Sequence, residues 1–448
     1  MPNARCAAVA VVVAALASVA TAAAQSHPTA ATGRVLFLVD RAAFPELRSG
    51  LETYARHIRA EFRIDCIARP DDYLTMSPTA IRKLLHDEYR AGSPPLVGAI
   101  LIGALPHALR GDPNELVLPL TLFYEDFDAV YTDRNGDGVY QESEIANDRL
   151  TNPTEIWTAW WIPPALEAAS QIKLLQGYLE KLDRYHRGEL PGRDQMLWLA
   201  GNVQDVEICE GWTVLLKDAL RPLDQRLRIW CRVGQDEGTF RPNKRKDEFT
   251  PRDFIAAFTL QTWQHAHIIT HGNGRGWYWD GSGVVGAAPS DGRPEAALVL
   301  DLAAFHGAGA QIVTTSGCSN GNFRGDGLRP DYDRALGNLL LFSPHTNTIA
   351  YYGAASPQST SGFAGYCTEL IESLSAGGGS YLAAGYQRMR NQDYSWGTQH
   401  FFFRGGDEKV LLGDPFARYR DSAPLTNSQD AAIEQKLRSA NWTVVGPG

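Results

Sequence analysis

The 448-residue sequence has little cysteine, no long basic stretch and no second long apolar run. Its formal net charge is −9, and its short basic run, Arg241–Phe249, is mixed with acidic residues, so nucleic acid is not an expected partner. After the N-terminus, no stretch reaches the roughly 18 apolar residues that a membrane span requires. The 44% hydrophobic and 21% charged residues instead fit a globular protein with a substantial core.

The first 24 residues have the pattern of an export signal. Arg5 precedes an apolar stretch, and small residues follow it up to a cleavage position predicted after Ala24. The apolar stretch is too short for a confident membrane span. We therefore expect residues 1–24 to be removed and the mature protein to be secreted or periplasmic, with no membrane attachment.

Cysteine is scarce, with six residues in the whole chain and five after the signal. An odd number in an oxidising compartment leaves at least one thiol unpaired. Cys209 and Cys231 flank one helix-like segment and could form a bridge, whereas Cys66 and Cys367 could pair or stay buried. The setting of Cys318, described below, makes it the expected free thiol.

From residue 34 onward, short apolar strands alternate with helical segments, which predicts mainly parallel sheets flanked by helices. The fold class is therefore α/β, with two adjacent α/β subdomains. We place the N-terminal subdomain at residues 34–190 and the second at 191–420, followed by a polar tail at 421–448. The strands are expected in the following segments: 34–40, 62–70, 96–105, 195–202, 226–233, 265–272, 310–317 and 347–356. The main helices are expected at 45–61, 77–92 and 164–187.

The stretch from Asp133 to Glu144 has the spacing of a calcium-binding loop. Oxygen-bearing side chains fall at loop positions one, three, five and twelve, the backbone carbonyl of position seven adds a ligand, and glycine stands at position six, where the turn is sharp. Those ligands are Asp133, Asn135, Asp137, Val139 and Glu144. No helix is evident before the loop, so we expect an isolated, stabilising Ca²⁺ site. No organic cofactor is expected.

Two apolar runs end in residues that can carry out peptide hydrolysis. The first, from His265, ends in His271-Gly272, and the second ends in Ser-Gly-Cys318, 47 positions later (318 − 271). Both lead into glycine-rich loops, and the carboxyl ends of parallel strands are where α/β proteins place their chemistry. A nearby imidazole favours the reactive thiolate, and the caspase histidine precedes its cysteine by about 50 residues. The pattern predicts a cysteine–histidine dyad at two neighbouring strand ends.

Two other hydrolase classes are alternatives to this dyad. His265, His267 and His271 share parity on a strand and could hold zinc on one side. A serine hydrolase would use a Gly-x-Ser-x-Gly turn, which the segments Gly365–Glu369 and Gly377–Tyr381 do not match. Zinc remains the weaker alternative, because no helpful Asp or Cys lies nearby in the sequence.

These blocks, with the closing segment Val410–Arg420, resemble the gingipain family of caspase-fold cysteine peptidases. The segment Leu118–Trp157, which contains the calcium-like loop, resembles the part that precedes the catalytic half in exported members. The resemblance extends over roughly residues 34–420. Departures include Trp160 and Trp161 where members continue into Gly-Arg, and Gly317 where alanine is common.

The resemblance implies a role for each site residue. Cys318 would attack the scissile carbonyl, His271 would be the general acid, and the backbone N–H groups of Gly272 and Cys318 would form the oxyanion hole. Glu155 is the candidate carboxylate for orienting His271. The acids considered for a substrate pocket are Asp280, Asp326, Asp331 and Glu167, and Trp277 and Trp279 are considered for the wall of a peptide cleft.

The leading hypothesis is an exported cysteine endopeptidase, which would act on a protein or peptide substrate. The alternatives are a catalytically silent exported binding protein of the same fold and, less favoured, a zinc hydrolase.

Overall fold

The fold is that of a computed structural model of the whole chain. The structure describes residues 31–111, 117–136, 138–140, 145–146, 153–165, 167–190, 192–203, 228–235, 251–273, 276–279, 283–286, 297–299, 307–315, 317, 319–324, 335–355, 370–371, 373–374, 380–392, 409–420, 427–440 and 443–445. For some residues within the helices and strands, only the backbone is described.

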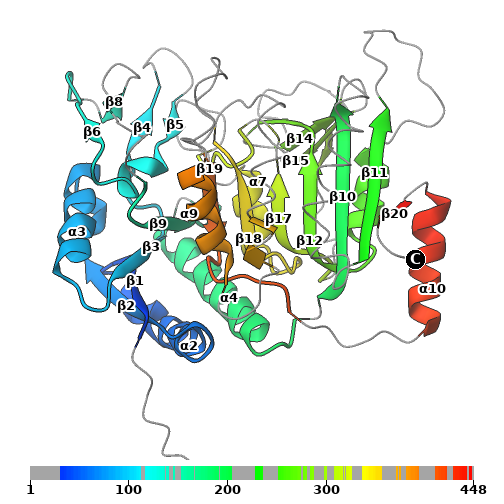
Figure 1. Cartoon of the computed structure of the whole chain (residues 1–448), viewed down its shortest axis with the longest axis horizontal. Coiled ribbons are helices and arrows are strands. Elements are labelled where there is room, and N and C mark those ends of the chain that lie inside the picture. Colours follow the sequence, from blue (N-terminus) through cyan, green and yellow to red (C-terminus); the bar gives the residue numbers. More distant parts are fainter. Residues whose placement is uncertain are drawn as a thin grey trace, which may run out of the picture.

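Strands and helices alternate along most of the described chain (Figure 1). The strands are β1 Gly33–Asp40, β2 Ile64–Asp71, β3 Leu96–Ile102, β4 Leu109–Arg110, β5 Leu118–Pro119, β6 Val130–Tyr131, β7 Val139–Tyr140, β8 Ile145–Ala146, β9 Trp157–Trp161, β10 Arg193–Val203, β11 Arg228–Gln235, β12 Thr262–Ile269, β13 His271–Asn273, β14 Gly276–Trp279, β15 Gly283–Gly286, β16 Ala297–Val299, β17 Gly309–Thr315, β18 Ala350–Ala354, β19 Lys409–Gly413 and β20 Thr443–Val445. The helices are α2 Phe44–Phe62, α3 Pro78–Ala91, α4 Ala168–His186, α6 Pro251–Phe258, α7 Leu336–Phe342, α9 Leu382–Gln392 and α10 Asn427–Ser439, with 3₁₀ turns η1 Tyr73–Thr75 and η2 Thr121–Tyr124.

One 11-stranded sheet runs through the molecule in the order β2-β1-β3-β9-β19-β18-β17-β12-β10-β11-β20. The strands from β2 to β19 are parallel to one another, and so are those from β18 to β11. The two groups run in opposite directions, because β19 and β18 pair antiparallel. The carboxyl ends of β17 and β18 therefore lie at the same edge of the sheet as the amino ends of β19 and β9, where "edge" means the line of strand ends. The expected α/β fold with mainly parallel sheets is confirmed.

The helices of the N-terminal half form where their sequence signals predict. Ser77 caps α3 by accepting the N–H of Ala80 at 3.2 Å, and Pro78 follows it at the first helical position. The amphipathic helices α2 and α4 lie side by side below the sheet (Figure 1). Their close packing needs a small residue at Gly50, where a Cβ would lie 2.9 Å from Leu179. β1 and β3 are almost wholly buried because helices and loops cover both of their faces.

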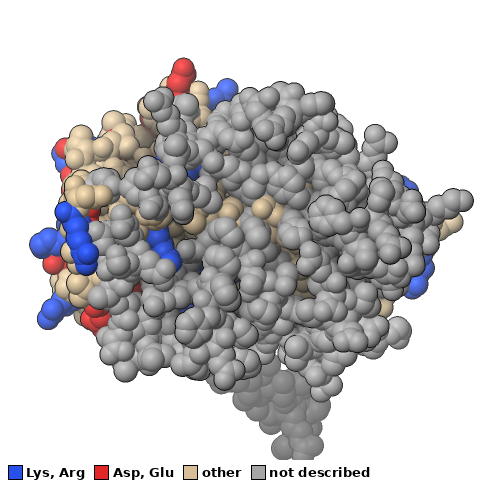
Figure 2. Space-filling view, turned by 90° about the horizontal axis from the view of Figure 1, so that it is seen from above, with Lys and Arg blue, Asp and Glu red and all other residues tan. Residues whose placement is uncertain are grey.

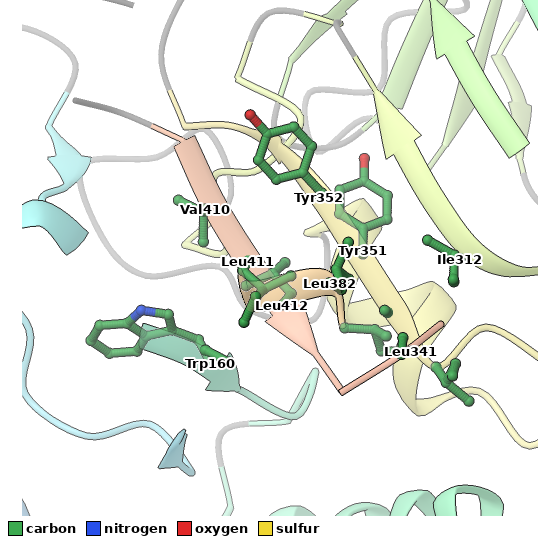
Figure 3. Packing of buried hydrophobic residues seen from close by; sticks show 14 of the residues in the cluster. Trp160, Ile312, Leu341, Tyr351, Tyr352, Leu382, Val410, Leu411 and Leu412 are labelled. Carbon is green, nitrogen blue, oxygen red and sulfur yellow. The ribbon is translucent and has the colours of Figure 1, made fainter. Parts of the chain in front are cut away.

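β19 joins the two halves of the sheet through a buried apolar cluster. Leu412 pairs with Trp160 of β9 on one side, and Leu411 pairs with Tyr352 of β18 on the other. Figure 3 shows these side chains packed around β19, and all are at most 1% exposed. The indole N–H of Trp161 donates to the carbonyl of Gly413 at 2.8 Å. The closing segment that resembles gingipains therefore supplies the strand that connects the two halves of the sheet.

The predicted polar tail also contributes to the sheet. It contains α10, and β20 pairs antiparallel with the edge strand β11. In Figure 2, basic and acidic atoms of described residues lie next to one another at the end of the molecule that carries α3, as the mixed charge of the sequence suggests. Among the described helices, none has the length and apolar character needed to cross a membrane. The predicted signal at residues 1–24 and the division at residues 190/191 stay predictions.

Candidate active site

The strands that precede His271 and Cys318 are direct neighbours in the sheet. β12 and β17 pair in parallel from Thr262 opposite Gly309 to Ile268 opposite Thr315. His271 begins β13 three residues after Ile268, and Cys318 is also three residues after Thr315. Cys318 and the side chain of His271 lie outside the described residues. The described ladder nevertheless leads both chain segments to the same edge of the sheet.

The backbone on both sides of position 318 is buried against the neighbouring strands. The N–H of Gly317 donates to the Thr315 hydroxyl at 3.1 Å, and a Cβ on Gly317 would lie 3.4 Å from the carbonyl oxygen of Thr270. Gly321 donates its N–H to the carbonyl of Ala354 at the end of β18, at 2.6 Å. The loop after β17 therefore turns back across the edge of the sheet and stays close to the segment before His271.

The loop contains a pattern that the sequence reasoning missed. Residues 317–321 read Gly-Cys-Ser-Asn-Gly and so match Gly-x-Ser-x-Gly, and Ser319 has a φ of 56°, rare for a residue other than glycine. Serine hydrolases place this serine, exposed, between a strand and a helix. Here Ser319 is 5% exposed, and turns rather than a helix follow it through residue 324. This local geometry differs from that of a serine-hydrolase nucleophile, which argues against Ser319 in that role.

His265 and His267 belong to a buried hydrogen-bonded chain. The Tyr419 hydroxyl contacts His265 Nδ1 at 2.6 Å, and the Thr314 hydroxyl lies 2.7 Å from His265 Nε2 and 2.6 Å from His267 Nδ1. Burial lowers the pKa of both histidines, to about 3 for His267, so both are neutral near pH 7. Of the four ring nitrogens of His265 and His267, three thus lie within hydrogen-bonding distance of a hydroxyl group. No cluster of metal-binding side chains occurs among the described residues. These contacts favour a structural role over the zinc alternative.

Glu155 lies at the edge of the sheet to which His271 leads, just before β9. Its carboxylate accepts the N–H of Phe127 at 2.6 Å. The pKa of Glu155 is raised to about 7, chiefly by burial; the Phe127 N–H opposes the shift, and the neighbouring Asp126 and Asp128 contribute to it. Four strand spacings, about 19 Å along the sheet, separate β9 from β12. Contact between Glu155 and His271 therefore depends on the loops and stays a prediction.

A second carboxylate, fully buried, belongs to Glu125, whose backbone carbonyl accepts the N–H of Glu155 at 3.0 Å, and sequence reasoning did not find it. Glu125 is fully buried, accepts the Thr158 hydroxyl at 2.6 Å and pairs with Arg390 at 3.1 Å. The hydroxyl of Tyr386 contacts both Glu125 and the carbonyl of Lys409 at the start of β19. Nothing in the local sequence indicates this pair, because Glu125 directly follows η2 and Arg390 lies in α9, more than 250 residues away. The pair stabilises the same sheet edge from within.

The described part of the calcium-like loop has the expected turns. Both carboxylate oxygens of Asp133 accept backbone N–H groups, from Gly136 at 2.7 Å and from Gly138 at 2.9 Å. Gly136 and Gly138 have φ values of 74° and 76°, which favour glycine. The element before the loop is β6 and not a helix, as expected. Asp137 and Glu144 lie outside the described residues, while Asn135 and the backbone of Val139 belong to the described part.

The positions of Glu167 and Trp277 exclude both from the substrate-recognition roles suggested by the sequence. Glu167 precedes α4 and follows the end of β9, so it lies at the opposite edge from His271 and is excluded as the acid of a pocket there. Trp277 is fully buried, donates its indole N–H to Thr315 at 3.1 Å and packs on Phe254, so it belongs to the core and not to a cleft wall.

The remaining candidate acids, Asp280, Asp326 and Asp331, and the side chain of Trp279 lie outside the described residues. Of the cysteines, Cys66 is a free thiol in β2, which corresponds to the unpaired alternative for this residue. Cys209 and Cys367 lie outside the described residues, and only the backbone of Cys231 is described.

The architecture is that of a caspase-like α/β protein. Comparison with solved structures gives chains with the same fold. One is described as a protease, with a TM-score of 0.58 and 12% identity over 89% of this chain and 81% of that chain. Another is the Arg-specific cysteine proteinase gingipain R, with a TM-score of 0.57 and 12% identity over 88% of this chain and 80% of that chain.

A third similar structure is the complex of the pro- and mature domains of Porphyromonas gingivalis RgpB, with a TM-score of 0.56 and 13% identity over 88% of this chain and 81% of that chain. No protein-family model matches the sequence, and no curated protein does. The chain therefore has the caspase-like fold of gingipain R over most of its length.

Proposed function

We propose that the protein is an exported cysteine endopeptidase with Cys318 as nucleophile and His271 as its partner. The observation that carries the proposal is the register of β12 and β17. Their last paired residues are Ile268 and Thr315, and positions 271 and 318 each come three residues later. The fold shared with the cysteine proteinase gingipain R supports the same assignment. The histidine and the cysteine come at the carboxyl ends of adjacent parallel strands, where α/β folds place their chemistry.

In the proposed reaction, the Cys318 thiolate attacks the scissile carbonyl carbon and forms a tetrahedral intermediate. The N–H groups of Gly272 and Cys318 bind the negatively charged oxygen, and each such donor is typically worth about 3–4 kcal/mol of barrier. His271 donates a proton to the leaving amine, and water then hydrolyses the thioester. Glu155, in its ionised form, would help to orient His271.

The proposal includes Ca²⁺ bound by the loop that begins at Asp133. The donor set consists of hard oxygen ligands, and the described turns at Gly136 and Gly138 wrap the chain around the Asp133 carboxylate. Asn135, Asp137, Val139 and Glu144 would complete the shell. The ion would stabilise the fold and take no part in peptide hydrolysis. The predicted export signal at residues 1–24 would place the mature chain outside the cytoplasm, where millimolar calcium fills even a weak site.

The test is cleavage of a mixed peptide library by the chain from residue 25 onward, read by mass spectrometry. Cys318→Ala and His271→Ala should abolish cleavage. Cys66→Ala should retain it, because Cys66 lies in β2, six strand positions from β17. Burial and nearby acids also raise the pKa of the Cys66 thiol well above its usual range and keep it protonated.

Ser319→Ala distinguishes the cysteine reaction from the serine alternative. The proposal expects this variant to keep cleaving the library. Unchanged cleavage by Cys318→Ala would contradict the proposal, and a loss confined to Ser319→Ala would assign the nucleophile to the serine. A chain that cleaves nothing, and whose Cys318 reacts like an ordinary thiol, would be the catalytically silent binding protein.

A further inference from the structure

We propose that Asn320 is a positioning residue, which fixes the loop carrying Cys318 against the hairpin that begins at His271. The inference rests on the proposed function and adds to it the residue that sets the spacing of the two catalytic segments. It concerns three elements that meet at one point. These are the end of β17, the loop at residues 317–321, and the β13–β14 hairpin.

The carboxamide of Asn320 joins these elements directly. Its Nδ2 donates to the carbonyl of Gly276 in β14 at 2.8 Å, and its Oδ1 accepts the Thr315 hydroxyl at 3.2 Å. Its own backbone N–H donates to the carbonyl of Gly317 at 3.3 Å and closes the turn around position 318. The side chain is 1% exposed, so solvent does not replace these bonds when they are lost.

Thr315 fixes which way the carboxamide points. Its hydroxyl accepts the N–H of Gly317 at 3.1 Å and the indole N–H of Trp277 at 3.1 Å, and it donates to Asn320 Oδ1. A threonine hydroxyl has one donor and two acceptor positions, so this arrangement uses all three. The amide oxygen therefore faces β17 and the amide nitrogen faces the hairpin.

Two glycines make room for the Asn320 carboxamide. A Cβ added to Gly272 would lie 2.4 Å from Asn320 Oδ1, and a Cβ added to Gly317 would lie 1.7 Å from it. Gly272 directly follows His271, and Gly317 directly precedes Cys318. The carboxamide thus occupies the space where side chains at these two positions would stand, and it touches the backbone next to both proposed catalytic residues.

This arrangement has a catalytic consequence. The imidazole and the sulfur belong to different chain segments, so their separation depends on what holds the two segments together. A displacement of about 1 Å can cost on the order of 100-fold in rate. Loss of the Asn320 bonds should therefore lower the rate of the chemical step more than it weakens substrate binding.

The experiment compares Asn320→Ala and Asn320→Asp with Asn347→Ala in the full mature chain. Asn347 is also buried, and its Nδ2 donates to Thr262 at 2.9 Å and to the carbonyl of Gly307. It joins the starts of β12 and β17 as Asn320 joins the segments after their ends. Asn320→Asp keeps the shape of the side chain but removes the donor to Gly276. The two measurements are steady-state cleavage of a library-derived peptide and the iodoacetamide alkylation rate of the Cys318 peptide at pH 7.

Both Asn320 variants should lose about 100-fold in kcat with KM changed by less than about threefold. Alkylation of Cys318 should fall by about tenfold or more, because a thiol without its imidazole is only a few per cent thiolate at pH 7. Asn347→Ala should lower the Tm but leave kcat and alkylation within about threefold of wild type, because it acts at the far edge of the sheet.

Gly317→Ala provides a test of the contact itself. In the wild-type background it should be as damaging as Asn320→Ala, since the new methyl group displaces the carboxamide. In the Asn320→Ala background it should have little further effect, because the atoms that it would strike are gone and the next one, the Thr270 carbonyl oxygen, is 3.4 Å away. Fully additive losses would argue against the contact.

Two outcomes separate failure of this inference from failure of the proposed function. A reactive wild-type Cys318 together with unimpaired Asn320 variants would overturn only the role of Asn320. Equal losses in the Asn320 and Asn347 variants would also overturn it, since general destabilisation would then explain both. A wild-type Cys318 that reacts like a free thiol, with or without His271, would remove the proposed function and this inference with it.

Discussion

Glu155 is a half-buried carboxyl group whose ionisation falls near neutral pH. Its pKa is raised to about 7, chiefly by burial and in part by the neighbouring Asp126 and Asp128. A carboxyl with this pKa is neutral in mild acid and charged in mild base. Its charge therefore changes in the range in which an imidazole also titrates, so a role beside His271 should be visible in the pH dependence of cleavage.

Glu155→Gln tests that role. In the wild type, kcat/KM should rise as pH increases through about 7, because only the ionised carboxylate can orient the imidazole. In the variant this rise should be absent, and activity at pH 8 should be lower by about tenfold. Asp128→Asn is the matched variant, since it removes an acid that raises the pKa of Glu155 and should move the rise to lower pH. An unchanged pH profile in Glu155→Gln would exclude the carboxylate from the reaction.

At the residue scale, sequence patterns nominate candidates whose signal is local and miss residues whose role depends on spatial contacts. The pairs His271-Gly272 and Gly317-Cys318 are readable because each directly follows an apolar strand. Asn320 is not readable, because its importance comes from contact with the hairpin more than 40 residues earlier. The polar and small residues after Cys318 are the one local signal that could have drawn attention to it.

Three elements are held together by a buried charged cluster at the edge of the sheet away from His271. Asp414, just after β19, accepts the Tyr54 hydroxyl of α2 at 2.5 Å and lies 3.0 Å from Nε2 of His186 in α4. Nδ1 of His186 lies 3.3 Å from Glu61, which also pairs with Arg420 at 2.7 Å. Burial and the nearby Arg420 guanidinium lower the pKa of His186, but Asp414 and Glu61 outweigh them, so the pKa is raised.

His186→Gln should therefore cost more stability in mild acid than in base. The pKa of His186 is higher in the folded than in the unfolded protein, so its contribution to the free energy of unfolding is full below about pH 6.5. That contribution is lost as the pH rises through the folded-state pKa. Removing one partner of a buried charged pair typically costs about 3–5 kcal/mol, so we expect about 3 kcal/mol at pH 6 and clearly less at pH 9.5.

Urea denaturation at the two pH values measures this difference. His57→Gln is the control, because His57 stacks on His186 but its partly exposed contact with Asp183 is worth less than about 1 kcal/mol. An equal loss at both pH values for His186→Gln would show that His186 is neutral in the folded protein.

At the scale of elements, apolar runs bounded by turns identify most strands of the large sheet. β1, β3, β10, β12, β17 and β18 overlap predicted segments, as do α2, α3 and α4. β20 was missed because it is short, lies at the edge, and takes its stability from pairing with β11. The position of β19 between β9 and β18 is also unreadable locally, since only the fold brings residues 409–413 beside residues 157–161.

At the scale of the whole molecule, the calcium-like loop is connected to the candidate site through a small sheet. Val139, at loop position seven, lies in β7 and pairs with Leu109 of β4. Just before β4, the ring of His107 packs on Phe323 at 5.1 Å, five residues after Cys318. When the calcium-like loop becomes more or less ordered, the change can therefore be transmitted through β7, β4 and His107 to the loop that carries Cys318.

Calcium should raise the Tm of the mature chain. At a concentration 100-fold above its Kd, a ligand specific for the folded state adds about 2.7 kcal/mol. With an unfolding entropy of about 2.1 cal/mol/K per residue, this predicts a rise of about 3 °C. Differential scanning calorimetry after EGTA treatment, with and without added Ca²⁺, measures the shift. Asp133→Ala should abolish the response, and an equal response in that variant would locate the ion elsewhere.

The central claim is that an imidazole and a thiol meet across the ends of β12 and β17. The pH dependence of iodoacetamide alkylation at Cys318, followed by mass spectrometry of its peptide, tests this meeting most directly. We predict fast alkylation below pH 7 in the wild type and a shift toward the profile of a free thiol, with a pKa of about 8.5, in His271→Ala. A profile that follows a free thiol in both proteins would contradict the claim.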